Sequence, residues 1–124
     1  MIAIGLGVVT LLVGSLVVAG TMTMNNLRVS DWKQDLFDLA PPSGARVVAR
    51  GTDFGLLGGN SNHCDKRAWI LLDTGPSPDE VEQYYTQRLE TNSVWIMVSV
   101  DDASRVRVEM FEPGTAAGWD PRCH

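Results

Sequence analysis

The sequence predicts an α+β protein, in which a single N-terminal transmembrane helix precedes a small β-β-α-β-β domain with one helix on a mostly antiparallel sheet. Three observations predict this class. The first 24 residues carry no charged side chain, a capping box starts a helix at Ser77, and apolar runs of strand length flank that helix. We therefore expect a transmembrane helix over 1–24, a juxtamembrane joint over 25–42 and an extracytoplasmic α+β domain over 43–124.

The leader from Ile2 to Gly20 is apolar except for Thr10 and Ser15. A bilayer core of ~30 Å needs roughly 20 such residues in a helix, so this segment is long enough to cross it. A cleaved signal peptide is one alternative, but the leader has no basic n-region and its apolar run is long. A buried core helix is another alternative, although such helices rarely lack polar residues on every face. The leader therefore favours a retained signal-anchor.

Small residues recur along one side of the leader. Ala3, Gly7, Thr10 and Gly14 follow one another at spacings of four, three and four, which places them on one face of a helix. Small residues let a second membrane helix approach closely, but membrane helices are also rich in Gly for other reasons. The pattern predicts that this helix packs against a larger integral membrane protein or complex.

The joint and the first half of the domain show clear local signals. Residues 25–40 have loose helical spacing and end at Pro41-Pro42, which predicts a short amphipathic helix. We then expect a strand over 45–50, a Gly/Asn-rich loop over 51–66 and a strand over 67–73. The capping box Ser77-Pro78-Asp79-Glu80 starts a helix that ends near Thr91.

The sequence predicts a β-hairpin over residues 94–112. The run Val94 to Val100 is continuously apolar and rich in β-branched residues, which predicts a central strand. Residues 105–112 alternate strictly after a turn at 101–104, which predicts a half-exposed strand. Trp69, Trp95 and Trp119 are expected in the core. The tail from Pro113 is expected to be irregular, and an exposed anchor for a partner is the alternative role of Trp119 in it.

Two cysteines, Cys64 and Cys123, stand near the two ends of the domain. An even cysteine count in a small domain behind an export-type leader predicts a disulfide, worth roughly 4 kcal/mol for a loop of about sixty residues. The adjacent His63 and His124 complete a Cys2His2 set, so a zinc site is one alternative, and two unconnected thiols are the other. Each His-Cys pair is directly adjacent, however, and neighbouring side chains in extended backbone point in opposite directions. We expect the disulfide and no metal.

Charge and topology restrict the location. The net charge of −5 and the pI near 4.8 argue against nucleic acid as a partner. Arg28 and Lys33 follow the span and, by the positive-inside rule, would place the domain in the cytoplasm. The cysteine pair argues for the oxidising side instead. We expect a single-pass protein of the cell membrane with an extracytoplasmic domain.

No motif for catalysis, cofactor binding or metal binding rises above its structural explanation. The stretch Gly55 to Asn60 lacks the spacing and the Lys-Ser/Thr of a phosphate loop, and Asp65 lacks the partners of a calcium loop. The chain has two histidines and no Gly-x-Ser-x-Gly turn. We therefore expect a protein that is not an enzyme and holds no cofactor.

These observations lead to one leading expectation of function and two alternatives. The chain is expected to be a non-catalytic accessory subunit of a membrane complex in a bacterial envelope. The bacterial source is suggested by eight Arg against two Lys and by frequent Gly, Val and Ala, a composition typical of a GC-rich genome. The first alternative is a membrane-tethered binding module that holds a soluble ligand in the Gly/Asn-rich loop 55–65. The second alternative is a small hydrolase or metalloenzyme, which would need His63 and an acid to meet in a cleft.

Overall fold

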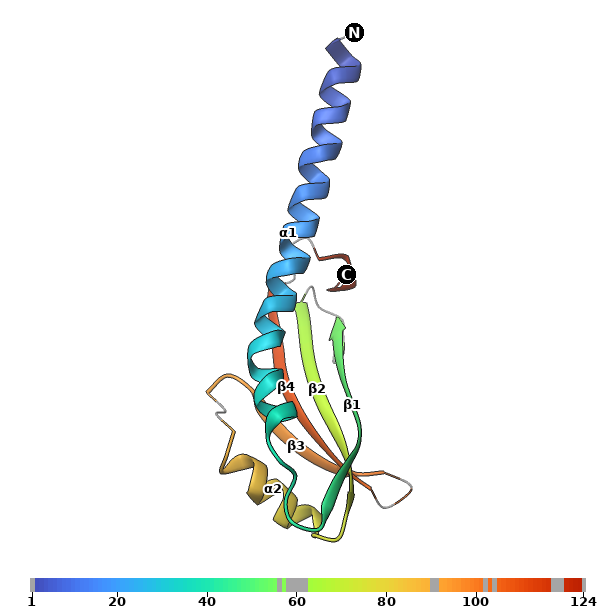
Figure 1. Cartoon of the computed structure of the whole chain (residues 1–124). Coiled ribbons are helices and arrows are strands. Elements are labelled where there is room, and N and C mark those ends of the chain that lie inside the picture. Colours follow the sequence, from blue (N-terminus) through green and yellow to red (C-terminus); the bar gives the residue numbers. More distant parts are fainter. Residues whose placement is uncertain are drawn as a thin grey trace.

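A computed structural model describes residues 2–55, 57, 63–89, 92–101, 103, 105–116 and 120–123 of the chain, and its class is α+β (Figure 1). In chain order the elements are α1 (Ile2–Asp38), β1 (Ala45–Gly55), β2 (His63–Thr74), α2 (Pro78–Thr86), β3 (Trp95–Val100), β4 (Val106–Ala116) and the 3-10 helix η1 (Pro121–Cys123). The four strands form one antiparallel sheet in the order β1-β2-β4-β3. The order of elements differs from the expected one, because span and joint are a single helix and η1 follows the last strand.

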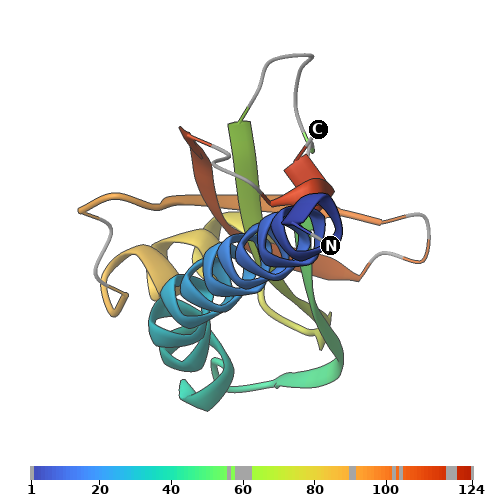
Figure 2. The same cartoon turned by 90° about the horizontal axis from the view of Figure 1, so that it is seen from above.

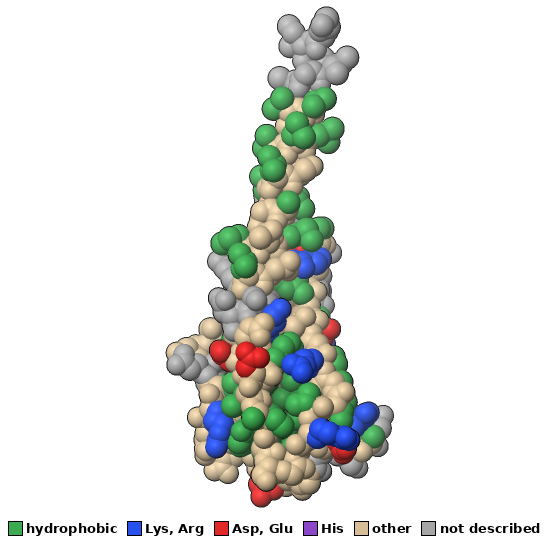
Figure 3. Space-filling model, viewed as in Figure 1, with side chains coloured by type: hydrophobic (Ala, Val, Ile, Leu, Met, Phe, Trp, Pro, Cys, Tyr) green, Lys and Arg blue, Asp and Glu red, His purple; other side chains and the backbone are tan. Residues whose placement is uncertain are grey.

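Helix α1 runs for 37 residues without a break, so the backbone shows no boundary at residue 24. Neither Gly nor Pro occurs between Gly20 and Pro41, so nothing interrupts the helical hydrogen bonds. The apolar half is exposed: a window of 18 residues has a mean hydropathy of 1.9 and no buried residue. By length and composition this half can cross a membrane, a test that an N-terminal signal sequence also satisfies. Figure 3 shows it free of charged side chains, which gather over the domain.

The other half of α1 belongs to the domain core. Leu36 is fully buried, and Trp32 and Phe37 pack against the same cluster. Helix α2 contributes Val81 and Tyr85 to this cluster, so both helices cover one face of the sheet (Figure 2). The two central strands supply six more buried side chains: Ala68, Ile70 and Leu72 of β2, and Val106, Val108 and Met110 of β4. Leu89 and Val94, which lie between α2 and β3 in the chain, complete the cluster. Each large apolar side chain buried here stabilises the fold by about 1.5–3 kcal/mol.

Helix α2 begins where the capping box predicts. The Ser77 hydroxyl accepts from the Glu80 amide, and the Glu80 carboxylate accepts from the Ser77 amide at 2.8 Å. The helix ends at Thr86, earlier than the expected end near Thr91, a residue outside the described ones. The amide of Arg88 bonds to the carbonyl of Tyr85, a three-residue spacing that tightens and closes the last turn.

The expected loop over 51–66 is wrong at both ends, because β1 continues to Gly55 and β2 already begins at His63. Gly51 is needed for packing, not for a turn. The Trp69 ring lies across it, and a Cβ at position 51 would stand 2.6 Å from a ring carbon. The glycine content that predicted a loop therefore marks a close approach within a strand.

The strand at 95–100 pairs with β4 as expected for a hairpin, but it is an edge strand and not a central one. The strand has apolar side chains on both faces. Ile96 and Val98 pack against the core under α2, whereas Trp95 and Met97 are exposed on the opposite face. Trp69 is half-buried on that outer face, so neither Trp69 nor Trp95 lies in the expected core, and Trp119 lies outside the described residues.

Strand β4 extends through Pro113 to Ala116, where an irregular tail was expected. Proline lacks a backbone donor, but the register between β2 and β4 shifts between Cys64 and Lys66, opposite this position. The buried carboxylate of Asp65 accepts from the Gly114 amide at 3.0 Å and so replaces a ladder bond at the shift. The strand therefore tolerates a Pro-Gly pair.

Tyr85 gives a prediction at alkaline pH. The Tyr85 hydroxyl is fully buried and has no hydrogen-bond partner among the described residues. Its burial, and to a smaller extent the nearby Tyr84, raises the pKa of Tyr85 from 10.0 to about 12. The unfolded state therefore ionises first, and stability is lost as the pH rises from 10 towards 12. We expect Tyr85→Phe to unfold less readily than the parent at pH 11 and to differ by less than about 1 kcal/mol at pH 7. Urea unfolding at both pH values checks this; equal alkaline loss in both proteins would contradict it.

Candidate functional site

The disulfide between Cys64 and Cys123 is present and closes the C-terminal end of the domain onto β2. The two Cα atoms lie 5.0 Å apart across a sequence separation of 59 residues, and both cysteines are fully buried. Phe54 of β1 packs against the pair. The expected disulfide is therefore confirmed, and it holds η1 between the ends of β1 and β2.

A buried carboxylate beside the disulfide ties this tail to α1. Asp120 is fully buried, and its Oδ2 accepts from the Asn25 side chain of α1 at 3.0 Å. The guanidinium of Arg122 binds both carboxylate oxygens, at 2.9 Å from Nε and 2.7 Å from a terminal nitrogen. Asn25 is itself 6% exposed, so this contact is shielded from water. We call Asn25, Cys64, Asp120, Arg122 and Cys123 the C-terminal clasp.

Arg122 extends the clasp to two further elements. One guanidinium nitrogen donates to the Asn26 side chain of α1 at 3.0 Å, and the guanidinium carbon lies 4.1 Å from the centre of the Phe54 ring. The backbone carbonyl oxygen of Arg122 would lie 2.7 Å from a Cβ at position 55. Gly55 has a φ of +137°, so only glycine suits this backbone and this approach. The clasp thus joins α1, β1, β2 and η1.

Charge stabilises the clasp strongly. The hydrogen bonds from Arg122, and then those from Asn25, hold the pKa of the Asp120 carboxyl far below its usual range despite its burial. The same pairing raises the pKa of Arg122. A carboxylate with several charge-assisted donors fixes its neighbours in orientation as well as distance. The clasp therefore attaches α1 to the C-terminal tail at the point where the exposed half of the helix leaves the domain.

The clasp does not suit a metal ion in its oxidised form. Ligand atoms of Cys64, Asp120 and Cys123 lie within 4.8 Å of one another, all buried. A thiolate is needed to ligate zinc, however, and both sulfurs are bonded to each other. The side chains of His63 and His124, the other members of the considered zinc set, lie outside the described part of the chain. The C-terminal clasp therefore holds α1, β2 and η1 together through a disulfide and hydrogen bonds.

Sequence reasoning identified the cysteines but missed the other members of the clasp. The signal available was the pair Asn25-Asn26, two amide side chains in a helix that before them carries no charge and only Thr and Ser as polar side chains. The tail Asp120-Pro121-Arg122-Cys123 carries both charges of the link within four residues of the chain. Neither segment indicates by itself which partner it meets, because 95 residues separate Asn25 from Asp120.

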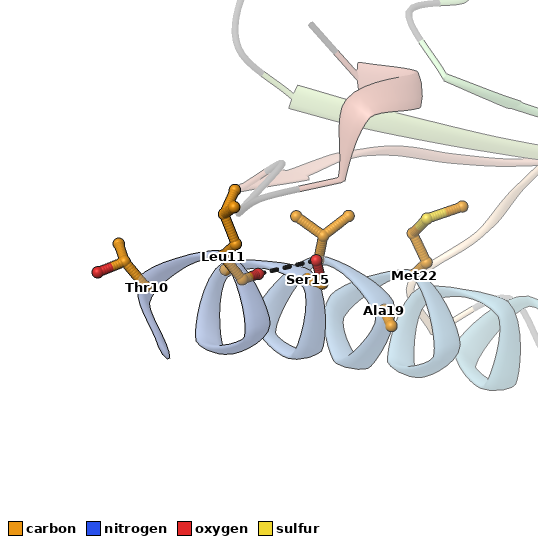
Figure 4. Close-up of a pocket in the computed structure, with 7 residues that line it drawn as sticks. Thr10, Leu11, Ser15, Ala19 and Met22 are labelled. Carbon is orange, nitrogen blue, oxygen red and sulfur yellow. Dashed lines mark hydrogen bonds between the residues drawn. The ribbon is translucent and has the colours of Figure 1, made fainter. Parts of the chain in front are cut away.

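The small-residue stripe of α1 lies on the exposed half of the helix. Gly7, Thr10 and Gly14 are exposed, and the side chain of Ala3 lies outside the described ones. A Cβ at Gly7 or Gly14 would meet nothing within 4 Å. A shallow groove of about 500 Å³ runs along this part of the helix, lined by Thr10, Leu11, Gly14, Ser15, Val18, Ala19 and Met22 (Figure 4). The structure thus leaves the stripe open for a neighbour.

The Gly/Asn-rich loop 55–65 is described only at its two ends and at Leu57. A hollow of about 380 Å³ adjoins its first residue and is lined by Asn26, Lys33, Thr52, Asp53, Phe54 and Arg122. Phe54 is the only apolar side chain in this lining. The hollow is therefore polar, whereas an apolar pocket would favour the binding of a soluble ligand.

Comparisons with other proteins give no family: no protein-family model, curated protein or solved structure matches this chain. The assignment of function therefore depends on the geometry of the molecule alone.

The clasp gives a prediction with a matched control. Asp120→Asn removes the charge between Arg122 and Asn25, and we expect it to lower the free energy of unfolding by about 2 kcal/mol at pH 7. Asp73→Asn breaks the exposed pair with Arg46, whose two side chains are 60% and 77% exposed, and should cost less than about 1 kcal/mol.

The pH dependence identifies the carboxylate as the cause. Because the folded pKa of Asp120 is lowered, its contribution is complete above the unfolded pKa of about 3.9 and is lost as the pH falls below it. The difference between Asp120→Asn and the parent should therefore shrink below about pH 3.9. Urea unfolding of the full chain in detergent micelles measures both effects; a difference that does not depend on pH would contradict this role.

Proposed function

We propose that the chain is a non-catalytic, single-span envelope protein that acts as an accessory subunit of a larger bacterial membrane complex. Its apolar helix crosses the cell membrane once, and its domain lies on the extracytoplasmic side. One observation carries the proposal: α1 is a single helix, exposed and apolar in one half, and packed and clasped to the domain in the other. Span and domain therefore move as one body.

This rigid link suits a structural role. A domain on a flexible tether samples many positions, whereas a domain fixed to its span presents its surfaces at a set height and direction. The exposed half of α1 offers the open groove beside Gly14, where another membrane helix can approach closely. The disulfide supports the extracytoplasmic side, because such bonds persist in oxidising compartments.

An apolar pocket beside the loop 55–65 would favour the alternative, a membrane-tethered module that binds a soluble ligand. The hollow described beside Phe54 is polar, and residues 56 and 58–62 of the loop lie outside the described part of the chain, so the accessory-subunit role is the leading proposal. The helix-packing residues Ala3, Gly7, Thr10 and Gly14 remain a prediction, and the two experiments below test the span and the stripe separately.

The first experiment tests the span. Washing membranes with alkaline carbonate releases peripheral proteins, while a helix that spans the bilayer remains in the pellet. We expect the full-length chain in the pellet and a variant that begins after residue 24 in the supernatant. Release of the full-length chain would show that α1 does not span the membrane.

The second experiment tests the stripe. Replacing both Gly7 and Gly14 by Leu fills the space in which a neighbouring helix would pack, and we expect recovery of the partner to fall at least about tenfold. Gly20→Leu is the matched control: it also meets nothing within 4 Å but lies off the stripe, so recovery should stay within about twofold of the parent. Co-purification in mild detergent followed by mass spectrometry measures recovery. Undiminished recovery with the double variant would contradict helix packing on this face.

A further inference from the structure

The sheet has two edge strands, β1 and β3, and they differ in how far they are protected. Strand β1 carries exposed Arg46 and Arg50, has a register shift at Val48, and is covered at Gly55 by η1. Charges, bulges and a covering segment are the usual means by which proteins prevent an edge from pairing with another strand. β1 is therefore a closed edge.

Strand β3 has none of these devices. Its sequence Trp-Ile-Met-Val-Ser-Val contains no charge, glycine or proline, and its register with β4 runs without a shift. Trp95, Met97 and Val100 are 60%, 41% and 55% exposed. Among the described residues, no backbone bond reaches its outer edge. β3 thus offers a regular row of backbone donors and acceptors flanked by apolar side chains.

We propose that β3 is a docking edge, to which an extended, uncharged segment of the partner membrane protein adds as a fifth strand. The inference rests on the proposed function and names the surface that the partner uses. The occupant should be an extended strand, because only an extended backbone can pair with the outward-facing N–H and C=O groups along the outer edge of β3. A helix or a lipid tail cannot form these hydrogen bonds. The position of β3, beside α2 and away from the apolar half of α1, requires a segment outside the membrane (Figure 1).

The charges beside β3 define the chemistry of that segment. On the outer face, Met97 pairs with Glu109 and Ser99 pairs with Arg107 on the neighbouring strand β4. Arg107 and Glu109 form an ion pair with each other, so their charges are balanced. Trp95 stands beside Phe111, with ring centres 6.2 Å apart. An added strand therefore finds a neutral, aromatic surface, which favours apolar residues at alternate positions and no net charge.

Symmetry argues against an antiparallel pair of β3 strands from two copies of this chain. Two antiparallel β3 strands would be related by a two-fold axis perpendicular to the sheet. Helix α1 lies along the sheet, so this axis would reverse its direction in the second copy (Figures 1 and 2). Two spans pointing in opposite directions cannot enter the same membrane from the same side. The proposal therefore commits to a strand from a different chain, and a crosslink between two copies is an outcome that would overturn it.

Photocrosslinking in intact membranes tests the proposal. The probe is a benzoylphenylalanine residue in the full-length chain at Met97, at Val48 on the closed edge, or at Leu12 in the span. Val48 is the matched control, because it is 41% exposed, as Met97 is. We expect the Met97 probe to attach to one segment of a membrane protein, the Val48 probe to attach at least about tenfold less, and the amides of 95–100 to exchange more slowly in the complex than in the isolated chain.

Substitution gives an independent measure. Met97→Lys places a charge against the added strand and should lower recovery of the crosslinked protein about tenfold, while Val48→Lys should leave it within about twofold. Both side chains are exposed, so both variants should keep the parent's thermal midpoint.

The outcomes separate this inference from the accessory-subunit proposal. A partner attached from Leu12 but not from Met97 would leave the subunit role standing and overturn the docking edge. A crosslink between two copies at Met97, equal yields from Met97 and Val48, or unchanged amide exchange would also overturn it. No protein crosslink from any of the three positions would overturn both proposals.

Discussion

The buried carboxylate of Asp120 is the point on which the relation between helix and domain depends. It receives donors from α1 and from η1, and η1 is in turn bonded through Cys123 to the start of β2. Below the clasp, α1 packs on the domain through apolar side chains such as Leu36, and the guanidinium carbon of Arg50 lies 5.7 Å from the centre of the Phe37 ring. Apolar packing is non-directional, whereas charge-assisted hydrogen bonds with defined donors fix an orientation. The direction in which the span leaves the domain is therefore set by polar contacts.

The disulfide and the ion pair contribute to the clasp in different ways. The disulfide restricts the unfolded chain and contributes roughly 4 kcal/mol in the chain-entropy model, whatever the orientation of its neighbours. The Asp120–Arg122 pair acts in the folded state, where it saturates a buried carboxylate and brings Asn25 and Asn26 to the tail. A domain of about eighty residues is marginal with its apolar core alone, so both contributions matter to it.

The two faces of the sheet are built for different purposes. The face under α1 and α2 is a conventional apolar core. The outer face is organised by alternating charges and rings: the guanidinium of Arg107 lies 4.3 Å from the centre of the Trp69 ring, and Arg67 bonds Asp53 at 2.9 Å. These pairs balance charges on the outer face and place a guanidinium over one of its rings. The face therefore resembles an interface in composition, apolar and aromatic with balanced charge, more than a simple solvated surface.

Sequence patterns were sufficient to predict those features that depend on residues close together in the chain. The uncharged leader predicted the long apolar helix, the Ser77 capping box predicted the start of α2, and strict alternation predicted the hairpin partner over 105–112. The cysteine pair predicted the disulfide, because two cysteines in one small domain allow a single intramolecular connection. Each of these features depends on residues close together in the sequence or on a unique pairing.

Other features were decided only by tertiary structure. Gly51 and Gly55 resemble loop residues in the sequence, but contacts with Trp69 and Arg122 from distant parts of the chain place them in β1. The apolar run of β3 is equally compatible with a central or an edge strand, and the order β1-β2-β4-β3 made it an edge. Asp120 became a buried anchor because folding brought Asn25 to it across 95 residues. The sequence by itself determined the elements and the covalent link; the long-range contacts determined strand order, exposed edge and helix direction, because those depend on neighbours that no local pattern specifies.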